Sequence, residues 1–212
     1  SKTYELFGQT KHMTPDEHYQ DLKRIILAIS GKARRINVIM PFLYESRQHK
    51  RNGRESLDSA FMLEELHNLG VSNILTFDAH DPRVANAAPM AGFENISAHY
   101  QVIKALKRLE PNLGQTNDDL MVISPDEGAL QRAMYYANVL GCELGTFYKR
   151  RDYTQVIEGR NPIINHEFLG ESAKGKDILI VDDMIASGES MFDIAREMRR
   201  MEADKIYCAA TF

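Results

Sequence analysis

Two adjacent carboxylates, Asp182 and Asp183, directly follow four apolar residues and precede a turn of small and hydroxyl side chains. A buried strand that runs through such a turn into a helix presents outward N–H groups at a helix N-terminus, an arrangement that favours a phosphate. The hydroxyls of Ser187 and Ser190 can donate hydrogen bonds to phosphate oxygens, and paired carboxylates suit the vicinal hydroxyls of a ribose. The segment therefore indicates a site for a sugar phosphate.

An ordinary strand–helix loop, with a serine as the helix N-cap, is the alternative interpretation of this segment. Ser187 and Gly188 alone would favour that alternative, but paired carboxylates at the end of an apolar run favour ligand binding. The chain contains neither Gly-x-x-x-x-Gly-Lys-[Ser/Thr] nor Gly-x-Gly-x-x-Gly. A Walker-type ATPase and a dinucleotide enzyme are therefore disfavoured.

Two more polar segments follow strand-like runs. Residues 78–81, Asp-Ala-His-Asp, come after 74–77, and residues 124–128, Ser-Pro-Asp-Glu-Gly, come after 120–123. In an open α/β sheet, ligands bind beyond the carboxyl ends of the strands. All three polar segments lie where that rule predicts a site.

Strand-like runs alternate with helices of period 3.6, which predicts a mainly parallel α/β sheet with helices on both faces. The expected strands are residues 36–40, 74–77, 120–123, 144–148, 178–181 and 206–210. Thr14, Pro15 and Glu17 have the pattern of a capping box that begins the first helix, which we expect to end at Gly31. The pattern pauses around residues 93–99, and we place a boundary there between domains 1–97 and 98–212.

Apolar residues at helical spacing predict which face of each helix points inward. The expected inward residues are Tyr19, Leu22, Ile26 and Ile29 in the first helix, Leu57, Phe61, Leu66 and Leu69 in the second, Val102, Ile103 and Leu106 in the third, Leu130, Ala133, Met134, Ala137 and Leu140 in the fourth, and Met191, Ile194, Ala195 and Met198 in the last. These five faces would cover the predicted sheet.

Composition narrows the class of protein. The chain has 212 residues, of which 43% are apolar, and a formal net charge of −4, which argues against a broad nucleic-acid-binding face. No apolar stretch approaches the ~18 residues of a membrane span, and we see no secretory leader. Cys142 and Cys208 lack metal-ligand spacing, so we expect buried free thiols in a reducing, cytoplasmic compartment. Because the chain begins with Ser and stops just after a strand-like run, we expect it to be part of a longer one.

The segment 182–190 resembles the phosphoribosyl-diphosphate signature of the phosphoribosyltransferase superfamily. Residues 41–51 resemble the Pro-Tyr-Phe-x-Tyr-x-Arg-Gln-Asp-Arg-Lys segment of the ribose-phosphate pyrophosphokinase family, 77–80 its Asp-Leu-His turn, 122–128 its Val-Ser-Pro-Asp-x-Gly motif and 148–151 its Lys-x-Arg loop. The segments follow the family's order over nearly the whole chain. The resemblance implies parallel-sheet α/β domains of the type I phosphoribosyltransferase kind, two related halves in the full-length family, with ATP on the side of 1–97 and ribose 5-phosphate on the side of 98–212.

The resemblance also implies a role for each matching residue. Arg47, Gln48 and His49 fall in the segment that contacts ATP in the family, and His80 and Asp126 match positions near Mg²⁺. The transition-state pair is matched by Lys149 and Arg151, and the ribose 5-phosphate cradle by Asp182, Asp183, Ser187, Gly188 and Ser190. The structural alternative for His80 is a histidine at a strand end without a ligand. For Lys149 and Arg151 it is a basic cluster in a solvated loop.

The implied reaction is pyrophosphoryl transfer from ATP to ribose 5-phosphate, in which the C1 hydroxyl attacks the β-phosphorus and AMP leaves. The resemblance implies Mg²⁺ as cofactor and a homo-oligomer, with no nucleic-acid or membrane partner.

Departures from the family pattern keep two other functions open. His49 stands where the family usually has Asp, and Ala186 replaces a common Asp, which favours a non-catalytic regulator that binds nucleotide or sugar phosphate. A nucleobase phosphoribosyltransferase is the third hypothesis. In those enzymes the position of Ala186 often holds a base, so alanine there argues against base transfer. Ser187 and Ser190 replace Thr and keep the hydroxyl donor.

Overall fold

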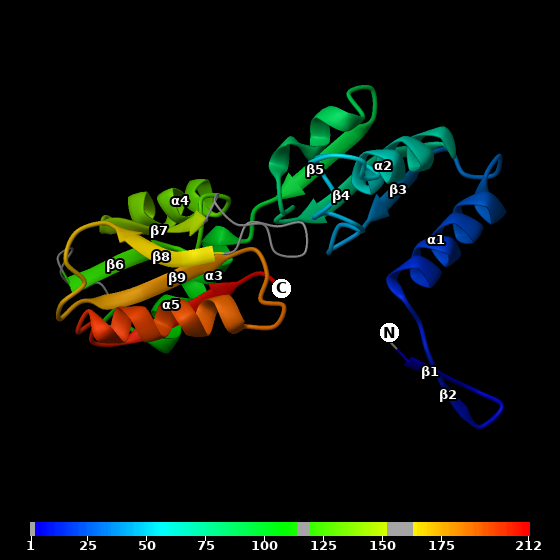
Figure 1. The fold of residues 1–212 in the computed structure, drawn as a ribbon. Helices are drawn as coiled ribbons and strands as arrows, with labels where there is room; N and C mark the ends of the chain where they lie inside the picture. The colour runs from blue at the N-terminus through cyan, green and yellow to red at the C-terminus, as the bar shows by residue number, and fades with distance from the viewer. Residues whose placement is uncertain (1–2, 114–118, 152–162) are drawn as a thin grey trace. The chain divides into compact units, whose positions relative to one another are not determined.

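The computed structural model describes residues 3–113, 119–151 and 163–212. The chain divides into two compact units, Ser1–Ser97 and Ala98–Phe212. Each unit is built around its own parallel or mainly parallel sheet, with helices packed on it (Figure 1). Each unit is therefore described by itself.

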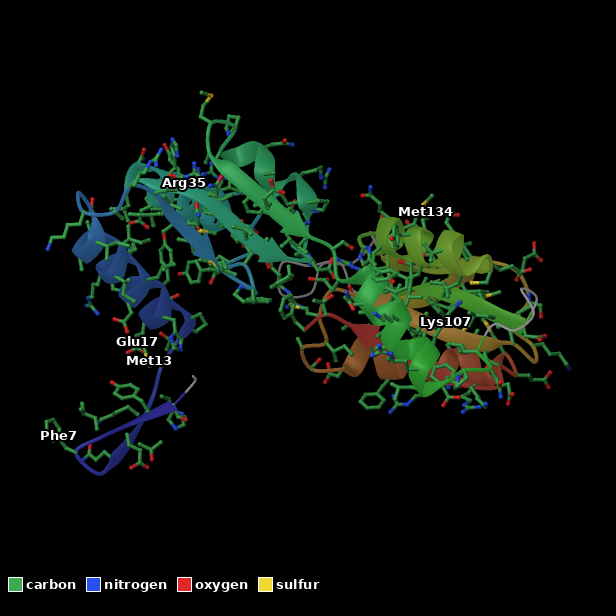
Figure 2. The ribbon with its side chains drawn as sticks, turned by 180° about the vertical axis from the view of Figure 1, so that it is seen from behind. Phe7, Met13, Glu17, Arg35, Lys107 and Met134 are labelled. Atoms are coloured by element: carbon green, nitrogen blue, oxygen red, sulfur yellow. The ribbon has the colours of Figure 1, made fainter. Side chains whose placement is uncertain are left out.

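The first unit contains a three-stranded parallel sheet in the order β3-β4-β5. Its elements are β1 (Thr3–Leu6), β2 (Gln9–His12), α1 (Pro15–Ile29), β3 (Ile36–Ile39), α2 (Asp58–Asn68), β4 (Val71–Phe77), the 3-10 helix η1 (Pro82–Ala87) and β5 (Gly92–Ile96). One core joins Ile26 of α1, Met62 and Leu66 of α2, and Val38 and Ile74 of the sheet. Strands β1 and β2 form an exposed antiparallel hairpin with Phe7 at its tip (Figure 2).

Helix α1 begins with the predicted capping box. The Glu17 N–H donates to the Thr14 hydroxyl oxygen at 3.2 Å, and the Thr14 N–H donates to Oε2 of Glu17 at 2.7 Å. Pro15 occupies the first helical position, where no N–H is needed. The helix ends at Ile29, slightly before the expected Gly31, and Ile29 itself is exposed. The predicted start of α1 and its capping box are therefore confirmed.

The second unit contains a five-stranded sheet in the order β10-β9-β6-β7-β8. Its elements are α3 (His99–Leu109), β6 (Leu120–Ser124), α4 (Leu130–Leu140), β7 (Glu143–Arg151), β8 (Ile163–Leu169), β9 (Asp177–Asp182), α5 (Glu189–Arg200) and β10 (Ile206–Ala210). Strands β10, β9, β6 and β7 are parallel, and β8 runs antiparallel to β7. This sheet positions the predicted sugar-phosphate segment at the end of β9.

Both faces of this second sheet are buried. Met121 and Ile178 point toward α5 and pack with Met191, Ile194 and Met198 in one cluster. The alternating residues of β6 and β9, Leu120, Val122, Leu179 and Val181, pack on the other face with Ile103 of α3 and with Ala133, Tyr136 and Ala137 of α4. Figure 1 shows α5 on one side of the sheet and α4 on the other. Burial on both faces explains why these strands appear as continuous apolar runs.

Three helices turn partly different residues inward than expected, and the prediction for Ile29 of α1 is wrong because it is 40% exposed near the end of the helix. Phe61 of α2 is 65% exposed, whereas Met62 and Leu63 are buried, so the prediction for Phe61 is wrong. Met134 of α4 is also exposed and points outward from its helix in Figure 2. Met134 is exposed because the buried face of α4 is shifted from the predicted one. Its buried residues are Ala133, Tyr136 and Ala137, at the spacing i, i+3 and i+4.

The two cysteines are free, as predicted, but they are not both buried. Cys142 is half-buried, and Cys208 is exposed on β10, the edge strand of the five-stranded sheet. An edge strand lacks a neighbour on one side, so a side chain there is covered less.

Among the helices in the described part of the chain, none has the length and apolar character needed to cross a membrane.

Candidate functional site

Parallel strands place two of the predicted polar segments at one edge of the second unit. Strands β6 and β9 are hydrogen-bonded neighbours, with Val122 opposite Leu179 and Ile123 opposite Ile180. Their carboxyl ends therefore meet at the same edge of the sheet, where the turn after β6 and the turn after β9 both begin. Burial of the strands on both faces fixes the position of these turns.

The turn after β9 is held by backbone hydrogen bonds to the residues after β10. The carbonyl of Asp183 accepts from the N–H groups of Thr211 at 3.1 Å and Phe212 at 3.0 Å. In return, the Ile185 N–H donates to the carbonyl of Phe212 at 2.8 Å. These three bonds fix the first part of the turn before any ligand binds.

The turn passes into α5 through a glycine in the left-handed region. Gly188 has φ of +81° and is the N-cap of α5, a conformation that a side chain would strain. The Glu189 N–H donates to the hydroxyl oxygen of Ser187 at 3.4 Å, and Ser187 and Ser190 are both exposed. A twelve-residue helix thus begins beside two accessible hydroxyls, and its N-terminus favours an anion.

The two carboxylates at the end of β9 differ in accessibility. The side chain of Asp182 is 27% exposed and that of Asp183 only 4%. The Asp183 N–H donates to Oδ1 of Asp182 at 2.8 Å. Burial raises the pKa of Asp182 to about 6, and the side chain of Asp183 acts in the same direction. The backbone N–H of Asp183 and the Arg132 guanidinium act in the opposite one. Asp182 is therefore the carboxylate of this pair that a ligand can reach directly.

Arg132 is a residue that the sequence interpretation missed. It lies in the first turn of α4, its side chain is 10% exposed, and its Nη1 is 3.9 Å from Oδ1 of Asp182 and 3.9 Å from Oδ1 of Asp183. The signal in the sequence was an arginine near the start of a helix, where the positive end of the helix dipole disfavours a cation.

Asp126 organises the turn after β6. The Ser124 hydroxyl donates to the carbonyl of Asp126 at 2.7 Å, and Oδ1 of Asp126 accepts from the N–H groups of Gly128 at 2.9 Å and Ala129 at 3.2 Å. Gly128 and Ala129 directly precede α4, so this carboxylate also stabilises the entry to the helix that carries Arg132. A role for Asp126 near a metal remains a prediction.

In the first unit, the loop after β3 is attached to the turn after β4. The Phe77 N–H donates to the carbonyl of Pro41 at 3.1 Å, and Nε2 of His49 lies 3.2 Å from Oδ2 of Asp81. The ring of His80 lies 5.4 Å from the ring of His49, between centroids. The structure therefore brings together two histidines from separate sequence motifs.

Arg47 and Gln48 lie in the same loop. The side-chain amide of Gln48 donates to the carbonyl of Ser56 at 2.9 Å, which closes the loop before α2, and Arg47 is exposed.

Asp81, in the turn after β4, has a lowered pKa of about 2 despite its burial. The main cause is a hydrogen bond from Arg83, and the charges of Arg83 and His49 act in the same direction. Asp81 was not among the predicted site residues, although it directly follows His80.

The remaining predicted residues are only partly described. Lys149 and Arg151 lie at the end of β7, paired in register with His166 and Ile163 of β8, but their side chains lie outside the part that the structure describes. His80 belongs to the first unit and Asp126 to the second. Within the described ranges, no three His, Cys, Asp or Glu side chains group closely enough to hold a metal ion.

Comparison with known protein families identifies both units. Residues 6–70 match the N-terminal domain of ribose phosphate pyrophosphokinase, and residues 92–212, more than half of the chain, match the phosphoribosyl transferase domain. The fold is that of the crystal structure of phosphoribosylpyrophosphate synthetase from Mycobacterium smegmatis. That structure has a TM-score of 0.79 over 98% of this chain and 70% of its own, at 20% identity. The predicted parallel-sheet, phosphoribosyltransferase-like α/β fold is confirmed.

Curated relatives agree with this assignment. The chain is 29% identical over 204 residues to a ribose-phosphate pyrophosphokinase of Chlorobaculum tepidum, covering 96% of this chain and 59% of that protein. It is 34% and 32% identical, each over 199 residues, to the proteins of that name from Mycoplasma pneumoniae and Mycoplasma genitalium, covering 90% of this chain and 56% and 55% of theirs. The chain thus spans little more than half the length of these relatives. Both domain matches and the relatives place the chain in the ribose-phosphate pyrophosphokinase family.

Proposed function

We propose that the intact protein is a ribose-phosphate diphosphokinase that converts ATP and ribose 5-phosphate to phosphoribosyl pyrophosphate and AMP. The observation that carries the proposal is the end of β9, where Asp182, the left-handed Gly188 and the N-terminus of α5 follow one another within a single turn. This turn combines an acceptor for sugar hydroxyls with donors for a phosphate.

The sugar phosphate binds along this turn. Asp182, which is partly exposed, accepts hydrogen bonds from the ribose hydroxyls. The hydroxyls of Ser187 and Ser190 and the N–H groups at the start of α5 hold the 5-phosphate. The hydrogen bonds from Thr211 and Phe212 to Asp183 keep the turn in place, so the C1 hydroxyl is oriented before the second substrate arrives.

The nucleotide binds on the first unit through the loop after β3. Arg47 and Gln48 contact ATP, and the His49–Asp81 pair holds this loop against the turn that carries His80. In the reaction, the C1 oxygen forms a bond to the β-phosphorus, and the bond between that phosphorus and the α,β-bridging oxygen breaks. AMP leaves with the bridging oxygen, and the proton of the C1 hydroxyl is released.

The candidate metal-binding side chains, Asp126 and His80, suit Mg²⁺ better than a metal ion that is bound entirely by protein ligands. Mg²⁺ is usually held by one or two carboxylates together with substrate phosphates and water. The Asp126 carboxylate in the second unit fits this requirement. His80, in the first unit, is the other candidate that the family resemblance implies. When bound, Mg²⁺ neutralises charge on the phosphates of ATP. Lys149 and Arg151 supply further positive charge to the transition state.

One assay tests the proposal. The intact protein is incubated with ribose 5-phosphate, ATP and Mg²⁺, and AMP and phosphoribosyl pyrophosphate are measured by chromatography. Equal amounts of both products support the diphosphokinase. Binding of ribose 5-phosphate without AMP formation would instead support a regulator, the candidate that Ala186 favours. Pyrophosphate release from phosphoribosyl pyrophosphate plus a nucleobase would support a transferase.

The protein acts on small molecules as a cytoplasmic homo-oligomer in this proposal. The relatives that support the assignment are metabolic enzymes, and the two cysteines of the chain are free, as in a reducing compartment. The molar mass of the intact protein in solution, measured by light scattering, tests the homo-oligomer.

A further inference from the structure

Arg132 occupies a position that is unfavourable for a cation. It is the third residue of α4, where the helix dipole presents its positive end, and its side chain is 10% exposed. Removing a guanidinium from water is costly unless neighbouring negative charges compensate. A buried arginine in the first turn of a helix therefore needs a specific anionic partner.

The partners are the two carboxylates at the end of β9. Nη1 of Arg132 is equidistant from Oδ1 of Asp182 and Oδ1 of Asp183, at 3.9 Å from each. Among the residues that the structure describes, the charged groups that act on the pKa of Asp182 are Asp183, next to it on the same strand end, and Arg132 from α4. Two carboxylates this close repel each other, and one of them tends to hold a proton unless a cation lies beside them.

We propose that Arg132 is the positioning residue of the sugar site, holding Asp182 and Asp183 side by side as charged carboxylates so that Asp182 can bind the hydroxyls of a pentose phosphate. This inference rests on the proposed function for the identity of the sugar. Because its side chain is only 10% exposed and lies beside both carboxylates, Arg132 acts on the ligand through Asp182.

The charge state of Asp182 matters for binding. An ionised carboxylate accepts hydrogen bonds that are roughly twice as strong as those of a neutral acceptor. The pKa of Asp182 is already raised to about 6 with the arginine present. Loss of the cation raises that pKa further, so a larger fraction of Asp182 would be protonated at neutral pH and a higher pH would be needed to ionise it.

Two substitutions separate charge from packing. Arg132→Met keeps most of the apolar stem and removes the charge, whereas Arg132→Lys keeps the charge with a different shape. The affinity for ribose 5-phosphate is measured by calorimetry between pH 6 and pH 9. At pH 7 we expect Arg132→Met to weaken binding by about tenfold or more and Arg132→Lys by about threefold or less. Raising the pH to 9 should recover most of the loss in Arg132→Met.

A charge-balanced variant covers the case in which Arg132→Met does not fold. Arg132→Met combined with Asp183→Asn removes one negative charge together with the cation, and circular dichroism checks that it is folded. If Arg132 acts through charge, Asp182 in this variant is ionised at pH 7, as ¹³C NMR of its carboxyl carbon would show. A carboxyl that stays protonated in the double variant would overturn the proposal, as would unchanged affinity and pH dependence in a folded Arg132→Met protein.

The NMR titration also separates this inference from the proposed function. It needs no ligand, so it reports the effect of Arg132 on Asp182 even if the wild-type protein binds no ribose 5-phosphate. Failure of the wild type to bind the sugar phosphate would refute the proposed substrate. An Asp182 pKa that is identical in the wild type and in Arg132→Met would refute the role of the arginine.

Discussion

Nε2 of His49 lies 3.2 Å from Oδ2 of Asp81, and the two side chains are only 10% and 11% exposed. The pair joins the loop after β3 to the turn after β4, two segments that are far apart in sequence and that both belong to the proposed ATP side. His49 stands where the family usually has Asp. With aspartate at this position, the loop would present a carboxylate to Asp81 instead of a donor, so the two positions depend on each other in this chain.

Replacing His49 by the usual residue of the family should therefore destabilise this protein. His49→Asp places two carboxylates in contact in a nearly buried place, and we expect a loss of about 1–2 kcal/mol in the free energy of unfolding. Urea denaturation at pH 7 measures this loss. His49→Asn, which keeps a hydrogen-bond donor without a charge, is the matched control and should be affected less. Equal stability of the two variants would contradict the argument.

The stability of the first unit should depend on pH through Asp81. The hydrogen bond from Arg83 holds the pKa of Asp81 at about 2, below its ordinary value of 3.8. A lowered pKa in the folded state means that the stabilisation is complete above the unfolded pKa and is lost as the pH falls through the folded one. The contribution should thus be present above about pH 5 and fade toward pH 2.

Comparison with Asp81→Asn measures that contribution. We expect the variant to be less stable than the wild type by about 1–2 kcal/mol at pH 7. Solvent around the exposed Arg83 weakens its interaction with Asp81, so the expected loss is smaller than the pKa shift alone would give. The difference should shrink at pH 3, as followed by urea denaturation at both values. A difference that stays constant between pH 7 and pH 3 would show that the charge of Asp81 does not matter.

Gly188 and Gly175 provide a matched pair for testing the phosphate turn. Their φ angles are +81° and +72°, and an added methyl group would contact no atom closer than 3.5 Å at Gly188 and none within 4 Å at Gly175. Alanine at either position should therefore cost a similar ~1 kcal/mol of backbone strain. Only Gly188→Ala should also weaken ribose 5-phosphate binding, by about tenfold, because Gly188 is the N-cap of α5. Equal effects of the two variants on affinity would contradict a phosphate site at this turn.

The sequence predicted best those elements whose local signals agree with their burial. Strands β6 and β9 are buried on both faces and form continuous apolar runs, so they were predicted to within one residue at each end. The capping box of α1 is determined by residues three apart in the chain, and it was predicted in full. In such places the local pattern carries the information because no distant contact changes it.

Elements that depend on distant contacts were missed. Strand β5 contains Gly92, Glu94 and Asn95 and lies at the edge of its sheet, so it lacks the apolar run that indicates a strand. Its place in the sequence was interpreted as a pause between domains. The exposed hairpin of β1 and β2 and the antiparallel edge strand β8 were missed for the same reason. Edge strands are identified by their pairing partner, which a single sequence does not show.

The site shows the same limit. Asp182, Asp183 and the turn after them were singled out as candidates because they adjoin one another in the sequence. Arg132 and Asp81 were not, because their ion-pair contacts arise only when α4 approaches β9 and when the loop after β3 approaches the turn after β4. Charged residues that act on a motif from another element have no fixed spacing from it, so only the folded structure identifies them.

Lys149 provides the most direct test of the proposed chemistry. Its place at the end of β7, in a motif that resembles the Lys-x-Arg loop, predicts that its cation stabilises the transition state and contributes little to ground-state binding. Removal of one such electrostatic interaction typically costs about 10²-fold or more in turnover. We therefore expect Lys149→Ala to lower kcat by that factor while the affinity for ribose 5-phosphate changes by about threefold or less.

The matched control for this variant is Lys174→Ala. Lys174 is an exposed lysine of the same unit that pairs with Glu202 and precedes β9, whereas the turn lies after the other end of that strand. Its removal should leave kcat within about twofold. Single-turnover measurements of AMP formation distinguish the chemical step from product release in both variants. If Lys149→Ala keeps kcat within about threefold of the wild type, this lysine has no part in stabilising the transition state, because removing a cation that acts there lowers turnover far more.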